Sequence, residues 1–356
     1  MSGAMNGATT GATTGAAILG LAGPVLGTEE AAFFRRADPW GFILFARNID
    51  TPARLKRLTA DLRDAVGRDA PIFIDQEGGR VQRLRPPHWR AWPAPLDQVN
   101  AMIARGAGVG AVLRGLWLRG RLIAAELSEM GIDANCAPGV DLARPETHDF
   151  LKNRCLGRQP AEVGARARAL AAGLMAGGVL PVIKHIPGHG RARADSHQTL
   201  PVVTASAEDL SRSDFAAFAA LRDMPMAMTA HIRFTAFDAA HPATQSRRMI
   251  GAIRDRIGFR GLLMTDDLSM QALEGSLGAR TAAAIGAGCD VALHCNGDPG
   301  EMAEVVAAAG RLEGAALARA EAALAQRRPP ADADLPALWA EFQRLTGWEP
   351  AEPVAG

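Results

Sequence analysis

The sequence predicts a single (β/α)8 TIM barrel, an α/β fold in which eight parallel strands form a closed ring surrounded by helices. Short apolar runs bounded by glycine, proline or aspartate recur eight times, and stretches with helical apolar spacing separate them. This alternation is typical of a parallel sheet covered on its outer face, and eight units favour closure. The length of 356 residues fits one barrel.

The boundaries of the predicted elements come from local signals. Thr51 is expected to cap a helix that begins at Pro52, with an apolar face along residues 55–66. Ser206 and Asp209 resemble a capping pair that begins a helix containing Leu210, Phe215, Phe218 and Leu221. The predicted strands are residues 18–22, 41–45, 72–75, 132–137, 180–185, 226–231, 261–265 and 290–293.

The chain divides into three segments. Residues 1–15 are mainly glycine, alanine and threonine and are predicted to be disordered, because they offer almost no side chains to bury. Residues 16–326 form the predicted barrel. Residues 327–356 begin with ArgArgProPro and are interpreted as a C-terminal tail that contains one docking helix.

Composition excludes several classes of partner. Lys plus Arg is 39 and Asp plus Glu is 38, so the net charge of +1 argues against a nucleic-acid partner. The four cysteines are interpreted as free thiols. The N-terminus lacks the basic and apolar regions of a secretory signal, and no apolar run approaches the roughly 20 residues of a membrane span. We therefore expect a cytoplasmic protein with no membrane partner.

In a barrel the active site lies where the strands end and the βα loops begin. Polar residues occur at several predicted strand ends, so the first candidate residues come from this rule. They are Asp75, Lys184, His185, His231, Asp266, Asp267, His294 and Asn296.

Residues 184–197 carry three of the eight histidines in a segment where Pro187, Gly188 and Gly190 oppose regular structure. One interpretation is that these histidines make ordinary structural hydrogen bonds. Another is a metal site, because imidazole and carboxylate are common zinc ligands, although the helical spacing of metalloprotease histidines is absent. The ligands of that site would be His185, His189, His197 and Asp195.

The third interpretation of the same segment is a dyad of Asp195 and His197. An aspartate two residues before a histidine can reach ring atom Nδ1 in a tight turn, which fixes the tautomer and supports the charged ring. The other nitrogen, Nε2, would then face a substrate. A histidine held in this way can donate a proton and later recover it.

Two other segments carry carboxylates at strand ends. Asp266 directly follows the predicted strand 261–265, and its neighbour Asp267 is available to cap the following helix. Asp75 ends another strand, and Gly78 with Gly79 permits a sharp backbone turn beside a ligand. A plain cap and a plain turn are the alternatives at these two places.

Together these segments resemble glycoside hydrolase family 3, specifically its single-domain β-N-acetylhexosaminidases of the NagZ type. The resemblance covers roughly residues 16–325 and rests on the order and spacing of four motifs. They are AspGlnGluGlyGlyArgValGlnArg, AsnArgCysLeuGly, LysHisIleProGlyHisGly followed by AspSerHis, and ThrAspAspLeuSerMet.

The resemblance implies a role for each matching residue. Asp266 matches the family's nucleophile, His197 its acid/base and Asp195 the partner of that histidine. The residues that match binders of the nonreducing-end N-acetylglucosamine are Asp75, Arg83, Arg154, Lys184 and His185. The implied activity is retaining hydrolysis of N-acetylglucosamine from 1,6-anhydro-N-acetylmuramic acid muropeptides, by a monomer that needs no cofactor or metal.

The position of His197 on a loop rich in glycine and proline leads to a further hypothesis. The loop would close over bound substrate and bring the proton donor with it, with Gly188 and Gly190 acting as hinges. Arg191 and Arg193 on the same loop either contact the lactyl carboxylate or peptide of the substrate or are simply solvated. A metal-dependent barrel hydrolase and a noncatalytic sugar-binding protein remain the alternative functions.

Overall fold

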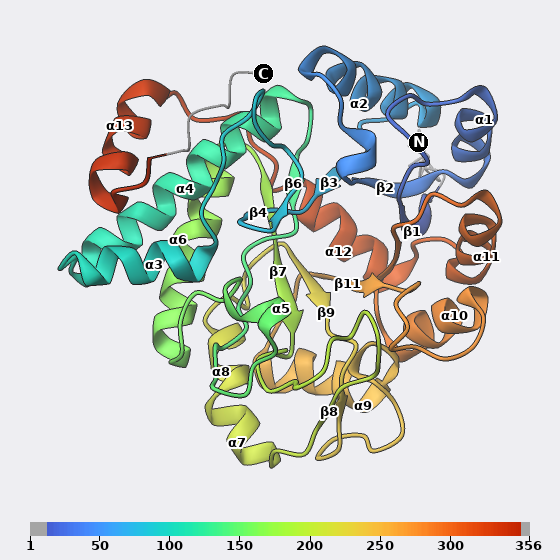
Figure 1. Ribbon diagram of the computed structural model, residues 1–356. Coiled ribbons are helices and arrows are strands. Elements are labelled where there is room, and N and C mark those ends of the chain that lie inside the picture. The colour runs from blue at the N-terminus through green and yellow to red at the C-terminus, as the bar shows by residue number, and fades with distance from the viewer. Residues whose placement is uncertain (1–12, 350–356) are drawn as a thin grey trace, which may run out of the picture.

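A computed structural model describes residues 13–349 and contains a closed barrel of eight parallel strands, which confirms the predicted fold class (Figure 1). Each of the eight predicted strands overlaps one barrel strand. Each barrel strand pairs with the barrel strands that precede and follow it along the chain, and β12 pairs with β1 to close the ring. The strands are β1 (Gly15–Leu19), β2 (Pro39–Leu44), β3 (Ile72–Ile74), β6 (Ala134–Asn135), β7 (Leu180–Ile186), β9 (Met226–Thr229), β11 (Leu262–Asp267) and β12 (Val291–His294).

The barrel strands are largely apolar and are buried on both faces. Ile18 of β1 is opposite Leu293 of β12 on one side and Gly41 of β2 on the other. Every residue of β1, β2 and β7 is buried, as expected for parallel strands that face helices outside and packed side chains inside. Closure brings the eight strand ends together at one mouth.

Most helices cover the outside of the ring, and the short helix 149–152 lies at the mouth of the barrel (Figure 1). They are α1 (Thr28–Ala37), α2 (Pro52–Val66), α3 (Pro95–Ala104), α4 (Val109–Glu129), α5 (Asp149–Lys152), α6 (Pro160–Ala176), α7 (Ala207–Arg212), α8 (Asp214–Ala219), α9 (Arg247–Ala252), α10 (Leu277–Ala287), α11 (Pro299–Ala309), α12 (Gly314–Leu324) and α13 (Leu335–Thr346). None of these helices is long and apolar enough to cross a membrane.

Both predicted caps are present, but one predicted helix is divided. The Thr51 side chain accepts the backbone N–H of Arg54 at the start of α2, and Ser206 accepts that of Asp209 at the start of α7. The helix that follows Ser206 does not continue as predicted, because Ser213 has φ −121° and ψ −88°. This non-helical residue separates α7 from α8.

The two ends of the chain are the predicted disordered segment 1–15 and the predicted tail 327–356. Most of the segment 1–15 lies outside the described residues, and Gly15 already belongs to β1. In the tail, α13 packs beside α4 (Figure 1), where Glu341 forms two hydrogen bonds with Arg114. Phe342 of α13 is fully buried. The four cysteines are buried free thiols.

Candidate active site

A cavity of about 400 Å³ opens where the barrel strands end. Seven of the eight predicted site residues line it: Asp75, Arg83, Arg154, Lys184, His185, His197 and Asp266. The eighth, Asp195, is bonded to His197. Of the strand-end candidates, Asp75, Lys184, His185, Asp266, Asp267 and Asn296 line the cavity, whereas His231 and His294 do not.

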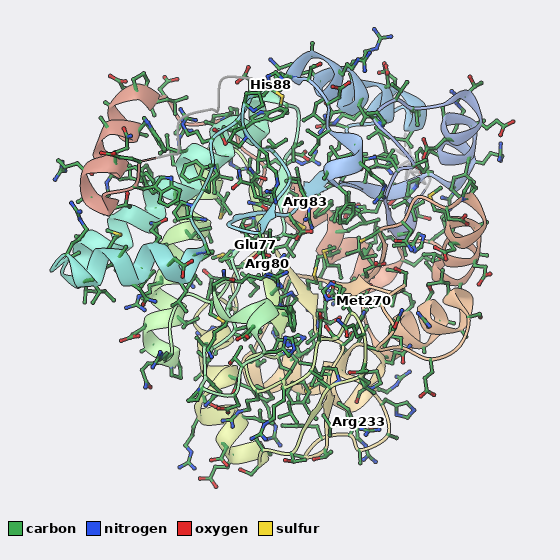
Figure 2. The ribbon with its side chains drawn as sticks, viewed as in Figure 1. Glu77, Arg80, Arg83, His88, Arg233 and Met270 are labelled. Atoms are coloured by element: carbon green, nitrogen blue, oxygen red, sulfur yellow. The ribbon has the colours of Figure 1, made fainter. Side chains whose placement is uncertain are left out.

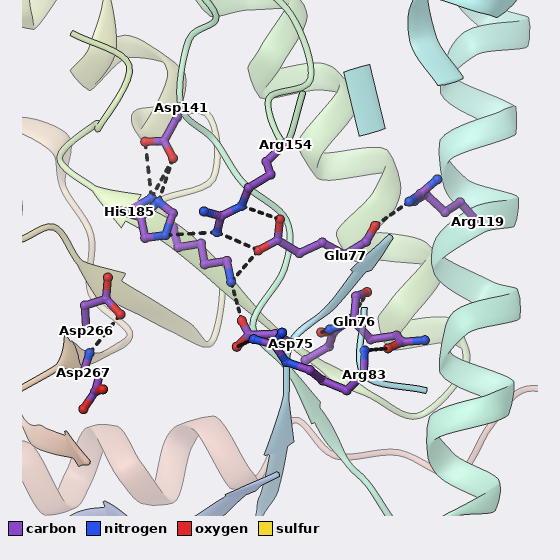
Figure 3. Close-up of polar contacts among 12 residues, drawn as sticks. Asp75, Gln76, Glu77, Arg83, Arg119, Asp141, Arg154, His185, Asp266 and Asp267 are labelled. Carbon is purple, nitrogen blue, oxygen red and sulfur yellow. Dashed lines mark hydrogen bonds and ion pairs between the residues drawn. The ribbon is translucent and has the colours of Figure 1, made fainter. Parts of the chain in front are cut away.

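Lys184 lies at the centre of a buried ion network on the cavity floor, between Asp75 and Glu77, which are labelled in Figure 3. Its Nζ is 2.6 Å from Oδ1 of Asp75 and 2.7 Å from Oε1 of Glu77. Arg83 holds the other oxygen of Asp75 at 3.1 Å. Lys184 comes from β7, whereas Asp75 and Glu77 follow β3, so the network joins two strand ends that are separated in the ring by β6.

Glu77 was missed as a site residue although it lies inside a motif that the sequence singled out. Its carboxylate accepts two hydrogen bonds from Arg154, at 2.9 Å from Nε and 2.8 Å from a terminal nitrogen. This bidentate pair orients the guanidinium within the cavity wall. One signal could have found Glu77. It lies two residues after Asp75, and the cationic candidates Arg83, Arg154 and Lys184 needed anions to pair with.

Asp141 is a second residue that sequence reasoning missed. Its carboxylate lies 2.7 Å from Nδ1 of His185 and accepts the backbone N–H of His189 at 2.6 Å. On the other side of the ring, Arg154 lies 3.4 Å from Nε2, which places the His185 proton on Nδ1. Asp141 follows the predicted strand 132–137 closely, so the strand-end rule extended by a few residues would have found it.

The charges of the floor are fixed by their neighbours. Burial alone would raise the pKa of Asp75, but the Lys184 and Arg83 cations outweigh it and hold that pKa well below its usual range. Burial likewise opposes ionisation of Glu77, but Arg154 and Lys184 lower its pKa to about 2. Both carboxylates are therefore ionised at neutral pH and accept hydrogen bonds only.

Asp266 stands at the end of β11, across the cavity from this network (Figure 3). One carboxylate oxygen accepts the backbone N–H of Asp267 at 2.8 Å, and this is the one hydrogen bond to the Asp266 side chain within residues 13–349. Burial would raise the pKa of Asp266, but the His185 and His231 rings and that N–H outweigh burial and lower it. An ionised carboxylate with one oxygen unoccupied faces the cavity.

The neighbouring Asp267 does not cap a helix, which corrects the sequence-based expectation. Its carboxylate instead accepts the backbone N–H of Ser269 at 3.1 Å and that of Cys295 at 3.2 Å. A turn follows Asp267, and the next helix, α10, is capped by Ser276. His231 holds the same backbone, because its Nε2 lies 3.0 Å from the carbonyl oxygen of Asp267.

Asp195 and His197 form the predicted dyad. Oδ1 of Asp195 is 2.7 Å from Nδ1 of His197 and also accepts the His197 backbone N–H at 3.0 Å. Burial would raise the pKa of Asp195, but these two contacts lower it. The His197 side chain is 62 % exposed, and its ring lines the cavity. With Nδ1 held by a carboxylate, Nε2 is available to a ligand.

The four side chains considered as metal ligands are engaged in three separate contacts. His185 is bonded to Asp141, His197 to Asp195, and Nε2 of His189 lies 3.1 Å from Oγ of Ser196. Burial, with the neighbouring His185 ring, lowers the pKa of His189 to about 4. Among residues 13–349, no three or more His, Cys, Asp or Glu side chains are placed to hold one metal ion.

The base of the His197 loop is closely packed, so the proposed glycine hinges need revision. A Cβ atom on Gly190 would lie 2.1 Å from the carbonyl oxygen of Leu142, and one on Gly188 would lie 2.9 Å from Cβ of Asp214. Both glycines are buried, whereas residues 197–199 are exposed. The glycines permit close backbone packing at the base of the loop, and the exposed part begins beyond them.

Arg191 does not face the cavity, which corrects one of its two predicted roles. Its Nε donates to the buried carboxylate of Asp214 at 2.8 Å, and a terminal nitrogen donates to Oγ of Ser213. Arg193 is exposed and does not line the cavity. Neither arginine is placed to contact a ligand bound between Asp266 and His197.

Comparison with known proteins identifies the family. The model of the glycosyl hydrolase family 3 N-terminal domain matches residues 29–327. The chain belongs to glycosyl hydrolase family 3. A β-hexosaminidase of Methylococcus capsulatus is 36% identical over 280 residues, which cover 78% of this chain and 81% of that protein. The chain is thus a glycoside hydrolase of the β-hexosaminidase group, as the motifs predicted.

Solved structures agree with this assignment. Native NagZ from Neisseria gonorrhoeae superposes with a TM-score of 0.80 at 30% identity, covering 94% of this chain and 96% of that one. The same protein in complex with N-trifluoroacetyl-D-glucosamine superposes with a TM-score of 0.76 at 29% identity, covering 94% and 98%. The resemblance to β-N-acetylhexosaminidases of the NagZ type is confirmed.

Proposed function

We propose that this family 3 hydrolase is a retaining β-N-acetylglucosaminidase that acts in the cytoplasm as a monomer during peptidoglycan recycling. Its substrate would be the muropeptide in which N-acetylglucosamine is joined to 1,6-anhydro-N-acetylmuramic acid. The observation that carries the catalytic part is the pairing of two groups in one cavity. Asp266 offers an ionised carboxylate there, and His197 offers a ring nitrogen backed by Asp195.

The first chemical step uses both groups. A carboxylate oxygen of Asp266 attacks the anomeric carbon, the bond from that carbon to the leaving oxygen breaks, and Nε2–H of His197 gives its proton to that oxygen. Asp195 stabilises the charged ring before the transfer and holds Nδ1–H after it. The product of this step is a sugar bound covalently to Asp266.

The second step releases the sugar. The neutral Nε2 of His197 takes a proton from water, and the water oxygen attacks the anomeric carbon as the bond to Asp266 breaks. Two displacements at one carbon retain its configuration. Retaining glycosidases normally use a second carboxyl group as acid and base. The charged ring before proton transfer attracts the Asp266 carboxylate and the neutral ring after it does not repel it, so Asp266 is ionised whenever it is not bound to the sugar.

The floor network suits the nonreducing-end sugar. Asp75 accepts hydrogen bonds from sugar hydroxyls, whereas Lys184 and Arg154 present N–H groups to hydroxyl and acetamido oxygens, and Nε2 of His185 offers an acceptor. Because these side chains are already paired with Glu77 and Asp141, their positions are set before substrate arrives. The ligand named for the Neisseria gonorrhoeae complex, a glucosamine derivative, has this chemistry.

Covalent trapping tests the proposal directly. A 5-fluoro N-acetylglucosaminyl fluoride should accumulate on the enzyme, and peptide mapping by mass spectrometry should find the added sugar on Asp266. The Asp266→Asn variant, which keeps the shape of the side chain, should remain unlabelled. A label on another residue, or none on an enzyme that cleaves the muropeptide, would contradict the covalent route.

Two simpler measurements address the alternatives. A noncatalytic sugar-binding protein would not release p-nitrophenol from p-nitrophenyl N-acetyl-β-glucosaminide, whereas this enzyme should. A metal-dependent hydrolase would lose activity on prolonged dialysis against a chelator and regain it with added metal. We expect turnover to be unaffected by the chelator, and light scattering should give the mass of one chain.

A further inference from the structure

One of the cations that line the cavity differs from the others in its contacts within the described residues. Five arginine and lysine side chains line the cavity, and four of them are hydrogen-bonded or ion-paired. Arg80 is the fifth, and its guanidinium makes no hydrogen bond or ion pair with any residue in the range 13–349. The side chain is exposed, and Figure 2 labels it beside Glu77 in the central part of the molecule.

Arg80 stands on the short hairpin formed by β4 (Gln76–Gly78) and β5 (Val81–Gln82). Gly78 and Gly79 have φ values of 102° and 59°, which let the hairpin turn tightly and place Arg80 at its tip. The backbone N–H of Gly79 donates to the carbonyl oxygen of Trp92 at 2.8 Å. The exposed guanidinium is thus carried by a fixed backbone.

The guanidinium lies on the same side of the cavity as the Asp195–His197 dyad. Its central carbon is 5.8 Å from the centroid of the Phe150 ring, and the same ring meets the His197 ring edge-on with centroids 5.9 Å apart. Burial, then the nearby Arg154 cation, lowers the pKa of Arg80, whereas the Glu77 and Asp195 carboxylates raise it. Arg80 therefore lies between the floor network and the dyad.

The location of Arg80 indicates which part of the substrate it contacts during the reaction. The acid in a glycosidase protonates the oxygen of the leaving group, so the leaving group lies on the side of His197. We propose that Arg80 binds the free lactyl carboxylate that the leaving group carries when it has no peptide, and thereby determines the preference for acidic over neutral leaving groups. This inference rests on the proposed function, because it takes His197 as the proton donor.

A carboxylate suits the Arg80 guanidinium better than a hydroxyl does. All the N–H groups of Arg80 are available, and a guanidinium binds a carboxylate through two parallel hydrogen bonds. An anion would also relieve the repulsion between Arg80 and Arg154, both of which face the cavity. The role that the sequence suggested for Arg191 and Arg193 is thereby assigned to a residue on a different loop.

A matched pair of substrates tests the inference. One is the disaccharide of N-acetylglucosamine and N-acetylmuramic acid with a free lactyl carboxylate, and the other is its lactyl methylamide, which has the same ring and linkage but no charge. For the unaltered enzyme, kcat/KM should favour the acid. In Arg80→Gln the ratio of the two kcat/KM values should fall about 10- to 100-fold, the usual effect of losing a charged hydrogen bond.

Two variants serve as comparisons. Arg80→Lys keeps the charge but loses the paired geometry, so its ratio should be intermediate. Arg193→Gln removes a cation from the exposed loop outside the cavity and should leave the ratio as it is. A ratio within threefold of the unaltered enzyme in Arg80→Gln, or an equal fall in Arg193→Gln, would overturn the inference.

The unaltered enzyme supplies a test that needs no variant. An ion pair at an exposed cation weakens as salt rises, so the preference for the acid should shrink between 20 mM and 500 mM sodium chloride. A preference that is absent, or insensitive to salt, overturns the role of Arg80 even when both substrates are cleaved. Failure to cleave either substrate would instead count against the proposed function.

Discussion

A single carboxylate oxygen of Asp195 accepts both the Nδ1–H and the backbone N–H of His197, at 2.7 and 3.0 Å. The ring and the chain that carries it are therefore oriented by the same atom. This arrangement fixes which ring nitrogen faces the cavity even though most of the imidazole is exposed.

Replacing Asp195 by Asn should lower kcat on a disaccharide substrate about 100-fold, within the range expected for impaired general acid catalysis. The amide cannot stabilise the charged ring. The loss should be smaller on p-nitrophenyl N-acetyl-β-glucosaminide, because p-nitrophenolate leaves with less protonation. Steady-state kinetics on both substrates measure this difference. Gln198→Ala, an exposed change on the same loop, is the control, and equal losses on the two substrates would argue against a role in proton transfer.

Glu77→Gln should destabilise the fold by roughly 3–5 kcal/mol at pH 7, because it leaves the Lys184 and Arg154 cations with one buried carboxylate fewer. Urea unfolding followed by tryptophan fluorescence measures the change. Lys56→Gln, which removes an exposed ion pair with Glu129, should change stability by less than about 1 kcal/mol.

The same variant should also change how stability depends on pH. The pKa of Glu77 is about 2 in the folded protein, below the usual 4.5, so its stabilising effect is fully present above about pH 4.5 and is lost as pH falls toward 2. Unfolding free energies measured between pH 6 and 3 should fall less steeply in Glu77→Gln than in the unaltered enzyme. Parallel curves would show that Glu77 does not titrate with a lowered pKa.

Gly190→Ala should destabilise the protein by about 1–3 kcal/mol, because its Cβ would meet the carbonyl oxygen of Leu142 at 2.1 Å. Gly286 is a useful comparison, since it is exposed within α10 and a Cβ there would meet nothing within 4 Å. Gly286→Ala should stabilise by roughly 0.5–1 kcal/mol. Thermal unfolding of both variants shows whether each substitution raises or lowers stability. An unchanged stability in Gly190→Ala would show that the base of the loop adjusts to the added Cβ.

Phe342→Ala tests whether α13 is an integral part of the fold. Phe342 is fully buried, and its ring lies 5.3 Å from that of Trp92. Truncating a buried phenylalanine costs about 3–5 kcal/mol, so the melting temperature should drop markedly. Glu341→Gln, which breaks a partly exposed ion pair on the same helix, should cost under about 1 kcal/mol. Similar melting temperatures for the two variants would mean that α13 is not docked in solution.

The fold was predictable because its signals are local. Apolar runs such as Ile18–Leu19 and Leu262–Met264 are recognisable in isolation, and so is the cap at Thr51. The division between α7 and α8 was not, because Ser213 carries no glycine or proline signal. Its side chain is held by contacts with Asp209 and Asp214 that form only in the folded chain.

A site residue was predictable where its position at a strand end placed it at the cavity. It was not predictable where its role depends on a partner that is distant in sequence. Asp75 and Asp266 directly follow apolar strands, so the barrel rule found them. Asp141 acts on His185, which is 44 residues away in sequence. The lack of a hydrogen bond or ion pair at the Arg80 guanidinium within residues 13–349 was likewise not predictable, because it depends on where the anions of other strands lie.

The ion network on the floor has a consequence for how this scaffold can change. Lys184 forms ion pairs with two carboxylates, and Glu77 forms ion pairs with two cations. Neutralising either one therefore leaves its neighbours with uncompensated buried charge. Losses at two members of such a set are not additive. New specificities are therefore easier to obtain by altering the rim, where side chains such as Arg80 stand alone, than by rebuilding the floor one charge at a time.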